Sequence, residues 1–172
     1  MKKLPALMLL TSCYFFSLPF ALAQNQIIGD WAVSRSTIYQ EAFTANASGS
    51  MAGVWCALKE ASCFAYFKTA NPCIDGRTIP ILVSSVVGAV AANSTCVKVM
   101  GNNGQPLVFN QVEIGLFTTA AESGSEFAFA IPLMGGQFAV LRFSSGGATD
   151  AIRQAMTLPA GAKDTRPRDQ VL

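Results

Sequence analysis

Histidine is absent from all 172 residues of this chain, and its absence excludes several kinds of chemistry. A Ser-His-Asp triad and a Cys-His nucleophile both need an imidazole as the general base. Histidine is also a common zinc ligand and the side chain that titrates near neutral pH. The chain therefore has no histidine-dependent hydrolase site, no histidine zinc site and no imidazole pH switch.

Charge is scarce as well, at 13% Asp, Glu, Lys and Arg, and it is balanced. The whole chain has 12 basic and 10 acidic residues, which gives a formal net charge of +2. Residues 1–23 hold two of the lysines and no acid, so the remainder has 10 residues of each sign. Because a neutral chain has no basic field to attract polyanions, we expect no nucleic-acid partner.

Sequence motifs for nucleophilic or redox catalysis are missing too. No Cys-x-x-Cys, Gly-x-Ser-x-Gly or Ser-x-x-Lys pattern occurs, and the glycine pairs do not form a phosphate-binding fingerprint. The acidic residues are scattered, so no two of them are marked as the carboxyl pair of a glycosidase. We therefore predict a protein that is not an enzyme and that needs no cofactor or metal.

The first 23 residues have the pattern of a secretory signal peptide. Lys2 and Lys3 precede an apolar run, and Ala21-Leu22-Ala23 forms a small-x-small site for cleavage after Ala23. An alternative is lipidation of Cys13, because Leu10-Thr11-Ser12-Cys13 resembles a bacterial lipoprotein box. Both alternatives predict a periplasmic or secreted protein.

The region from residue 54 to residue 96 contains the other four cysteines, Cys56, Cys63, Cys73 and Cys96. In a secreted chain, four cysteines predict two structural disulfides rather than a reactive site. Cys56 and Cys63 lie in adjacent β-like runs joined by a short loop, so a cross-strand bridge fits a hairpin. We favour the pairs 56–63 and 73–96, and the sequence leaves the other two connectivities open.

Short apolar runs separated by turn signals predict a mostly β fold, a single antiparallel sandwich or barrel of about seven to nine strands. The apolar run 80–92 is too short and too interrupted for a membrane span, so we expect one or two strands there and no span in the mature chain. Alternation also predicts a strand over 112–118, followed by a turn.

One short helix is expected at the C-terminal end, over residues 150–156, with Thr149 as its cap. The polar, proline-containing segment 159–172 is predicted to be a flexible tail. The domain organisation predicted from the sequence is thus a signal peptide at 1–23, a single β-rich domain at 24–158 and the tail.

The hairpin over residues 54–68 is the candidate contact surface. Trp55, Phe64, Tyr66 and Phe67 give both of its faces apolar side chains, although only one face can pack on a single core. If the other face is exposed, these four residues form a binding surface. The alternative is that a second layer, such as the run 80–92, covers it.

Two short motifs near the ends of the chain carry a resemblance to a known family. Gly29-Asp30-Trp31-Ala32-Val33 and Ser145-Gly146-Gly147-Ala148-Thr149-Asp150-Ala151-Ile152, with Cys56 and Cys63 between them, resemble the invasion-associated locus B proteins. Members of that family are small secreted bacterial proteins with an all-β core and a terminal helix-like turn. The resemblance implies an envelope protein with a non-catalytic role.

The sequence therefore favours a secreted or periplasmic binding protein of the bacterial envelope, with a host- or stress-related role among the expectations. Its partner would be another envelope or secreted protein, or a small apolar ligand. One alternative is an inhibitor of a secreted hydrolase, which would insert an exposed loop such as 101–105 or 118–125 into a cleft. A second alternative is a histidine-independent hydrolase that uses paired carboxylates.

Overall fold

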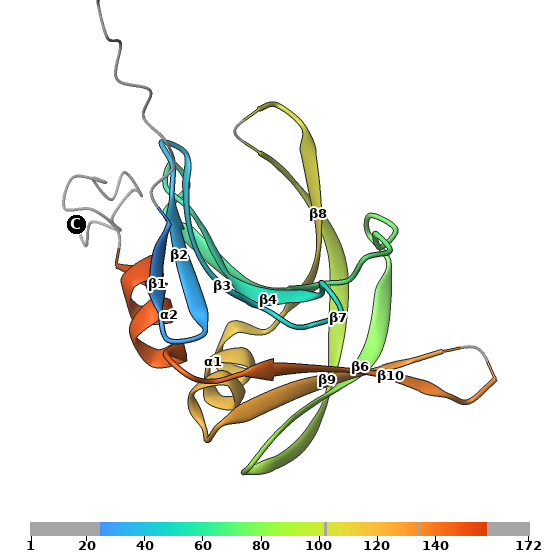
Figure 1. The fold of residues 1–172 in the computed structure, drawn as a ribbon. Coiled ribbons are helices and arrows are strands. Elements are labelled where there is room, and N and C mark those ends of the chain that lie inside the picture. Colours follow the sequence, from blue (N-terminus) through green and yellow to red (C-terminus); the bar gives the residue numbers. More distant parts are fainter. Residues whose placement is uncertain (1–24, 102, 134, 158–172) are drawn as a thin grey trace, which may run out of the picture.

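The computed structural model describes residues 25–101, 103–133 and 135–157. Ten strands and two helices make up this part of the chain (Figure 1). In order they are β1 (Gln26–Ile28), β2 (Trp31–Arg35), β3 (Tyr39–Ala45), β4 (Met51–Ala57), β5 (Ser62–Lys68), β6 (Thr78–Ser85), β7 (Gly88–Met100), β8 (Pro106–Val112), α1 (Ile114–Glu122), β9 (Glu126–Pro132), β10 (Phe138–Ser144) and α2 (Ala148–Met156).

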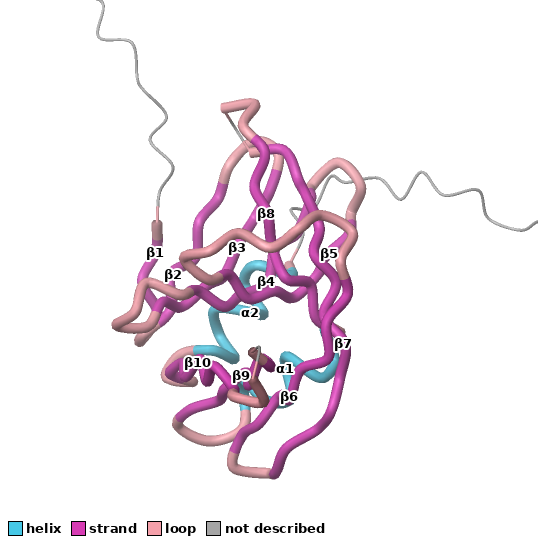
Figure 2. Tube along the Cα trace, turned by 90° about the vertical axis from the view of Figure 1, so that its right-hand side faces the viewer, coloured by secondary structure: helices cyan, strands magenta, loops and turns pink. Residues whose placement is uncertain are grey.

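All ten strands form one antiparallel sheet in the order β1-β2-β3-β4-β5-β8-β7-β6-β9-β10. Most neighbours are successive hairpin strands, whereas the pairs β5–β8 and β6–β9 join segments that are distant in sequence. The sheet curls so that its two halves face each other, with the helices between them (Figure 2). The predicted mostly antiparallel β fold is confirmed, and within the described residues no pairing joins the edge strands β1 and β10.

The inner core lies between the two halves of the sheet and the helices. It collects alternate side chains of both halves, because successive residues of a strand point to opposite faces. Its large, fully buried members are Trp31, Val33, Val54, Phe67, Val83, Phe117, Phe127, Phe129 and Ile152. Several of its aromatic rings are stacked or edge-to-face, which adds favourable geometry to the area that they bury.

Helix α2 confirms the expected C-terminal helix but begins earlier than predicted. Its N-cap is Gly147, with φ of 92°, and no side chain caps the helix, so the cap predicted at Thr149 is wrong. Glycine adopts this left-handed conformation without steric cost. Ala148, Ala151, Ile152 and Ala155 are buried and pack α2 onto the sheet.

Helix α1 replaces the strand that the alternation over 112–118 predicted, and much of the turn expected after it. The carboxylate of Glu113 accepts hydrogen bonds from the backbone N–H groups of Gly115 and Leu116, which caps the first turn. These two bonds lower the pKa of Glu113. Phe117, Ala120 and Ala121 are buried at helical spacing, so tertiary packing selects the helix over the strand.

The two terminal motifs that carry the family resemblance meet where the sheet nearly closes. The N–H of Asp30 donates to the carbonyl of Gly146 at 2.8 Å, and Trp31 Nε1 donates to the carbonyl of Ser144 at 3.0 Å. Gly29 and Gly147 lie against this junction so closely that a Cβ atom on either would overlap the facing backbone. The glycines are therefore required by the close approach of the two chain segments.

Among the described residues, no helix has the length and hydropathy needed to cross a bilayer. The predicted signal peptide at 1–23, the alternative lipidation at Cys13 and the predicted tail at 159–172 lie outside the described residues.

Candidate functional site

The two disulfides have the pairing favoured from the sequence. Cys56 and Cys63 are directly opposite each other on β4 and β5, with Cα atoms 4.0 Å apart. Cys73 and Cys96 are joined across a Cα–Cα distance of 5.8 Å. Because both bonds are already formed, these cysteines act as cross-links and supply no free thiol.

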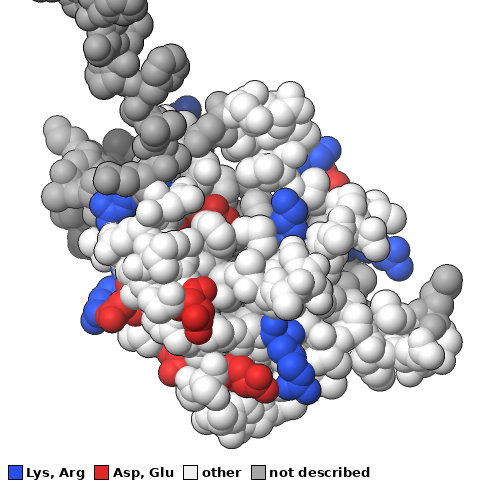
Figure 3. All heavy atoms as spheres, viewed as in Figure 1, with Lys and Arg blue, Asp and Glu red and all other residues white. Residues whose placement is uncertain are grey.

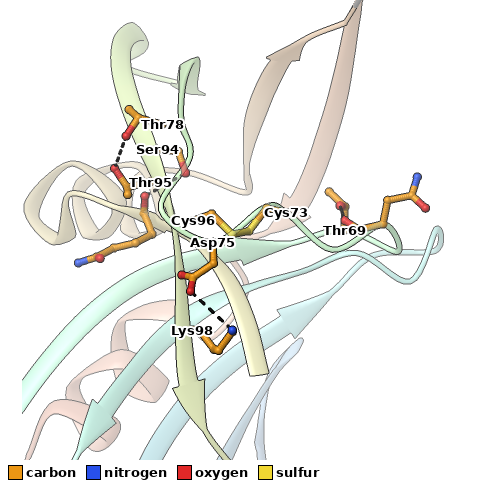
Figure 4. Close-up of a disulfide and its surroundings, with 10 residues drawn as sticks. Thr69, Cys73, Asp75, Thr78, Ser94, Thr95, Cys96 and Lys98 are labelled. Carbon is orange, nitrogen blue, oxygen red and sulfur yellow. Dashed lines mark hydrogen bonds and ion pairs between the residues drawn. A yellow bond between two sulfur atoms is a disulfide. The ribbon is translucent and has the colours of Figure 1, made fainter. Parts of the chain in front are cut away.

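The second disulfide attaches the segment that precedes β6 to the long strand β7 (Figure 4). Backbone hydrogen bonds at Gly76 and Arg77 to Cys96 support the same attachment, and Lys98 forms an ion pair with Asp75 at 3.7 Å. Both ion-pair partners are about half exposed, so this interaction contributes little. The disulfide is the main constraint on this segment.

The proposed contact surface of Trp55, Phe64, Tyr66 and Phe67 is corrected by the structure. Tyr66 and Phe67 are fully buried and Trp55 is 3% exposed, so these three are packing residues, and only Phe64 is half-buried. Phe67 points into the inner core, and the other three lie on the opposite face of the hairpin. They therefore do not form one exposed patch.

The opposite face of the hairpin is occupied by a second hydrophobic group, which we call the aromatic cluster. The expected cover, residues 80–92, is not part of it. Its partners come instead from β3 and from the hairpin of β7 and β8. The cluster consists of Tyr39, Phe43, Trp55, Phe64, Tyr66, Val97, Val99, Leu107 and Phe109.

A pocket of about 460 Å³ opens beside the aromatic cluster. Trp55, Phe64 and Val99 of the cluster contribute to its wall, and Ile38 and Met100 extend the apolar lining. Ala57 and Ser62 also line it, and the charged residues among the lining are Lys59 and Glu60, both exposed. The ring of Trp55 is stacked on Tyr39 with centroids 3.8 Å apart, which fixes the orientation of the indole.

A buried carboxyl lies next to Trp55 on the neighbouring strand. Glu41 is directly opposite Trp55 in the β3–β4 pairing, and its Oε1 accepts a hydrogen bond from the hydroxyl of Tyr66. Burial raises the pKa of Glu41, and the Tyr66 bond and the charge of Lys68 oppose the rise without cancelling it. Burial and the nearby carboxylate also raise the pKa of Tyr66 well above its ordinary value.

Gly53 lies on β4, the strand between β5, which carries Tyr66, and β3, which carries Glu41. It is the pairing partner of both Phe43 and Tyr66, so it lies under the path of the tyrosine side chain. A Cβ atom at this position would overlap the backbone of Ala42 and Phe43. Only glycine fits here, because any side chain would overlap strand β3.

A second pocket, of about 280 Å³, opens near the Cys73–Cys96 disulfide. Phe67 contributes to its wall, but Thr69, Asn71, Arg77 and Asn110 make much of its lining polar. It is smaller and more polar than the pocket beside Trp55. The larger pocket is therefore the stronger candidate for an apolar ligand.

The structure also places the residues considered for a hydrolase inhibitor and for a hydrolase with paired carboxylates. Most of the candidate inhibitory loop 118–125 belongs to α1, which removes it as an extended insertion loop. The other candidate, 101–105, lies between β7 and β8, and its residue 102 is outside the described residues. The buried partner of Glu41 is a tyrosine hydroxyl rather than a second carboxyl, and among the described residues no group of three or more acids and cysteines could hold a metal.

Sequence reasoning identified Trp55 and Phe64 but missed the pocket that they line. Ile38 comes from the turn before β3, and Val99 and Met100 come from the far end of β7. Their approach depends on the non-local pairing of β5 with β8, for which the sequence has no local signal. The weak polar alternation of the hairpin was the one usable sign that both of its faces are covered.

The fold has a counterpart among solved structures, although no protein-family model and no curated protein sequence matches the chain. The chain is similar to a small protein built on this type of curled β fold. That protein is invasion associated protein B from Bartonella henselae, whose crystal structure aligns with a TM-score of 0.50 and 9% sequence identity. The alignment covers 77% of this chain and 96% of the other. The resemblance inferred from the terminal motifs is thereby confirmed at the level of the fold.

Proposed function

We propose that this protein is a non-catalytic binding protein of the bacterial envelope, and that it holds a small apolar ligand in the pocket beside Trp55. The observation that carries the proposal is the combination of a volume of about 460 Å³ with a mainly apolar, partly aromatic wall. Pockets that bind small molecules have volumes of about 300–1,000 Å³ and linings of this kind.

The lining also indicates the kind of ligand. Trp55 is held by its stack on Tyr39, and Phe64 and Val99 complete an apolar wall beside it. Because Trp55 is buried and Phe64 is half-buried, a flat, unsaturated group gains burial here mainly by contact with the ring of Phe64. Lys59 and Glu60 at the pocket are exposed and of opposite sign, so they do not select a strongly charged ligand.

The localisation in this proposal follows from the signal-peptide pattern of residues 1–23 and from the two disulfides, which persist in oxidising compartments. The Bartonella protein of similar fold is described as invasion associated, and a role in contact with a host is included in the proposal on that basis. Export is tested by N-terminal sequencing of the secreted protein, with cleavage after Ala23 expected.

Ligand binding is tested with N-phenyl-1-naphthylamine, an uncharged aromatic dye that fluoresces in apolar surroundings. We expect saturable fluorescence with one dye per chain. Ser62→Phe places a large ring at the pocket and should weaken dye binding by about tenfold or more, which is about 1.4 kcal/mol.

Thr78→Phe is the matched control for that substitution. Ser62 and Thr78 are each the first residue of a strand, both are exposed and both carry a hydroxyl, but Thr78 is not part of the pocket. Thr78→Phe should bind the dye as the native chain does. If the native chain shows no saturable binding, or if both variants lose it equally, the pocket is not a ligand site.

A further inference from the structure

Strand β10 forms one edge of the sheet, and in the part of the chain that the structure describes its outer half lacks the features that usually protect an edge. Within the described residues the strand pairs with β9 on one side only, and the hairpin of β9 and β10 extends away from the body of the molecule (Figure 1). In natural proteins, lysine, proline, a β-bulge or a covering element keeps an edge strand from pairing with another chain. The outer part of β10 reads Phe138-Ala139-Val140-Leu141, with Phe138 58% and Val140 52% exposed.

The pairing with β9 determines which backbone groups point away from the sheet. The N–H of Leu133 donates to Gln137 and that of Ser145 donates to Ser125, so both ends of the hairpin are anchored by hydrogen-bonded pairs. Since bonded and non-bonded pairs alternate in an antiparallel ladder, Ala139 and Leu141 bond to β9. The N–H and C=O groups of Phe138, Val140 and Arg142 therefore face the open edge.

The side chains beside this edge form an uncharged row across four strands. Val140 is paired with Ala130, Ala130 with Leu82, and Leu82 with Ala91, all on the outer face of the sheet. The charged side chain next to the row is Arg142, which pairs with Glu126 at 3.0 Å. Figure 3 shows that charged atoms are sparse on the visible face of the molecule.

We propose that β10 pairs antiparallel with β10 of a second copy of this chain, about a two-fold axis at Val140. In this register Val140 lies opposite Val140 of the second copy, and Phe138 lies opposite Arg142 of the second copy. The backbone N–H and C=O groups that face the edge in one copy are thus opposite those that face it in the other. The row of small apolar side chains then continues across the axis into the second copy. Antiparallel pairing of identical strands is self-complementary, as a two-fold interface requires.

Two properties favour a second copy of this chain as the partner of β10: this self-complementarity and the balanced charge of the chain. The chain beyond residue 23 has equal numbers of basic and acidic residues, so two copies do not repel each other through net charge. Each copy also places the guanidinium of Arg142 opposite the ring of Phe138, which is a favourable cation–π arrangement. The edge lies outside the lining of the pocket beside Trp55, so the two proposals are independent.

The first test is the oligomeric state of the full chain, exported with its own leader and measured by sedimentation velocity over a wide range of concentration. Val140→Pro removes an N–H that faces the open edge and makes no bond to β9, so the fold should tolerate it. We expect the native chain to dimerise and Val140→Pro to associate at least about tenfold more weakly, which is about 1.4 kcal/mol. Val140→Thr keeps the N–H and should still dimerise.

A second test works even if Val140→Pro does not fold. Residues opposite each other in a bonded pair have Cα atoms about 5.5 Å apart, which a disulfide can span. Val140→Cys should therefore form a covalent dimer under mild oxidation, whereas Phe138→Cys, which lies opposite Arg142 of the second copy, should not. A native chain that stays monomeric, a dimer that persists in a folded Val140→Pro variant, or equal cross-linking of the two cysteine variants overturns the proposal.

Discussion

The inner core and the aromatic cluster lie on opposite faces of the same strands, β4 and β5, and they differ in what closes them. The inner core is enclosed by the second half of the sheet and by two helices, and its large members are fully buried. The aromatic cluster borders an open pocket, and its Tyr66 donates a hydrogen bond to the buried carboxyl of Glu41. The comparison indicates that the inner core contributes most to stability, whereas the aromatic cluster positions the proposed binding site.

The largest expected effect comes from removing an aromatic ring of the inner core. Phe129 is fully buried and lies 4.8 Å from Phe67 between ring centroids, so Phe129→Ala should lower the free energy of unfolding by about 3–5 kcal/mol. Phe64→Ala, in the half-buried part of the aromatic cluster, should cost about half as much or less. Urea unfolding of both variants measures the difference, and equal losses would contradict the comparison.

The contribution of each disulfide to the free energy of unfolding should depend on the length of the loop that it closes rather than on whether its cysteines pack in the inner core. The sequence separations are 7 for Cys56–Cys63 and 23 for Cys73–Cys96. The chain-entropy relation gives about 2.5 kcal/mol for the first and about 3.5 kcal/mol for the second. Urea unfolding of the two double Cys→Ala variants measures these values. Cys56 packs in the inner core, so a larger loss for its pair would show that packing outweighs chain entropy.

Loss of the Tyr66 hydroxyl tests the buried pair beside the aromatic cluster. Tyr66→Phe leaves the carboxyl of Glu41 without the hydrogen bond that it accepts, and this should cost about 1–3 kcal/mol at neutral pH. The cost should shrink at acidic pH, where the carboxyl is neutral. Phe109→Leu, a neighbour in the cluster without a polar atom, serves as the control because its cost should not change with pH.

The smallest expected effect is a pH dependence that Glu41 contributes. Burial raises the pKa of Glu41, so the folded chain keeps this proton to a higher pH than the unfolded chain does. Stability should therefore fall as the pH rises from the ordinary carboxyl value of 4.5 through the raised pKa of Glu41, and then level off. Glu41→Gln should remove this fall. The free energy of unfolding of the native chain and of Glu41→Gln, measured across that pH range, gives the size of the fall. Parallel curves for the two proteins would show that Glu41 is not its source.

Local patterns in the sequence predicted the hairpins well. The positions of Cys56 and Cys63 in adjacent β-like runs predicted a hairpin and favoured the disulfide that joins its two strands, although they left the other connectivities open. The error at α1 has a physical reason, because Ile114 and Leu116 alternate like a strand while Phe117, Ala120 and Ala121 are buried as a helix. A short segment fits both periods, and packing against the sheet decides between them.

The pocket and the aromatic cluster were less accessible to sequence reasoning. They depend on the pairing of β5 with β8, which brings residues 97–109 beside residues 39–66. Sequence patterns report which face of a strand is apolar, but not which distant strand will lie beside it. The apolar character of Trp55 and Phe64 was therefore visible, whereas the group of residues that surrounds them was not.

The junction of Gly29–Trp31 with Ser144–Gly147 constrains when this protein can finish folding. Its hydrogen bonds join residues 113 and 114 positions apart, so the strands that emerge first cannot close until almost the whole chain is present. Sequential hairpins can form early, but contacts of this range are slow because a long loop must be ordered first. A chain exported with its N-terminus leading would thus remain open throughout translocation and close only when the segment before α2 arrives.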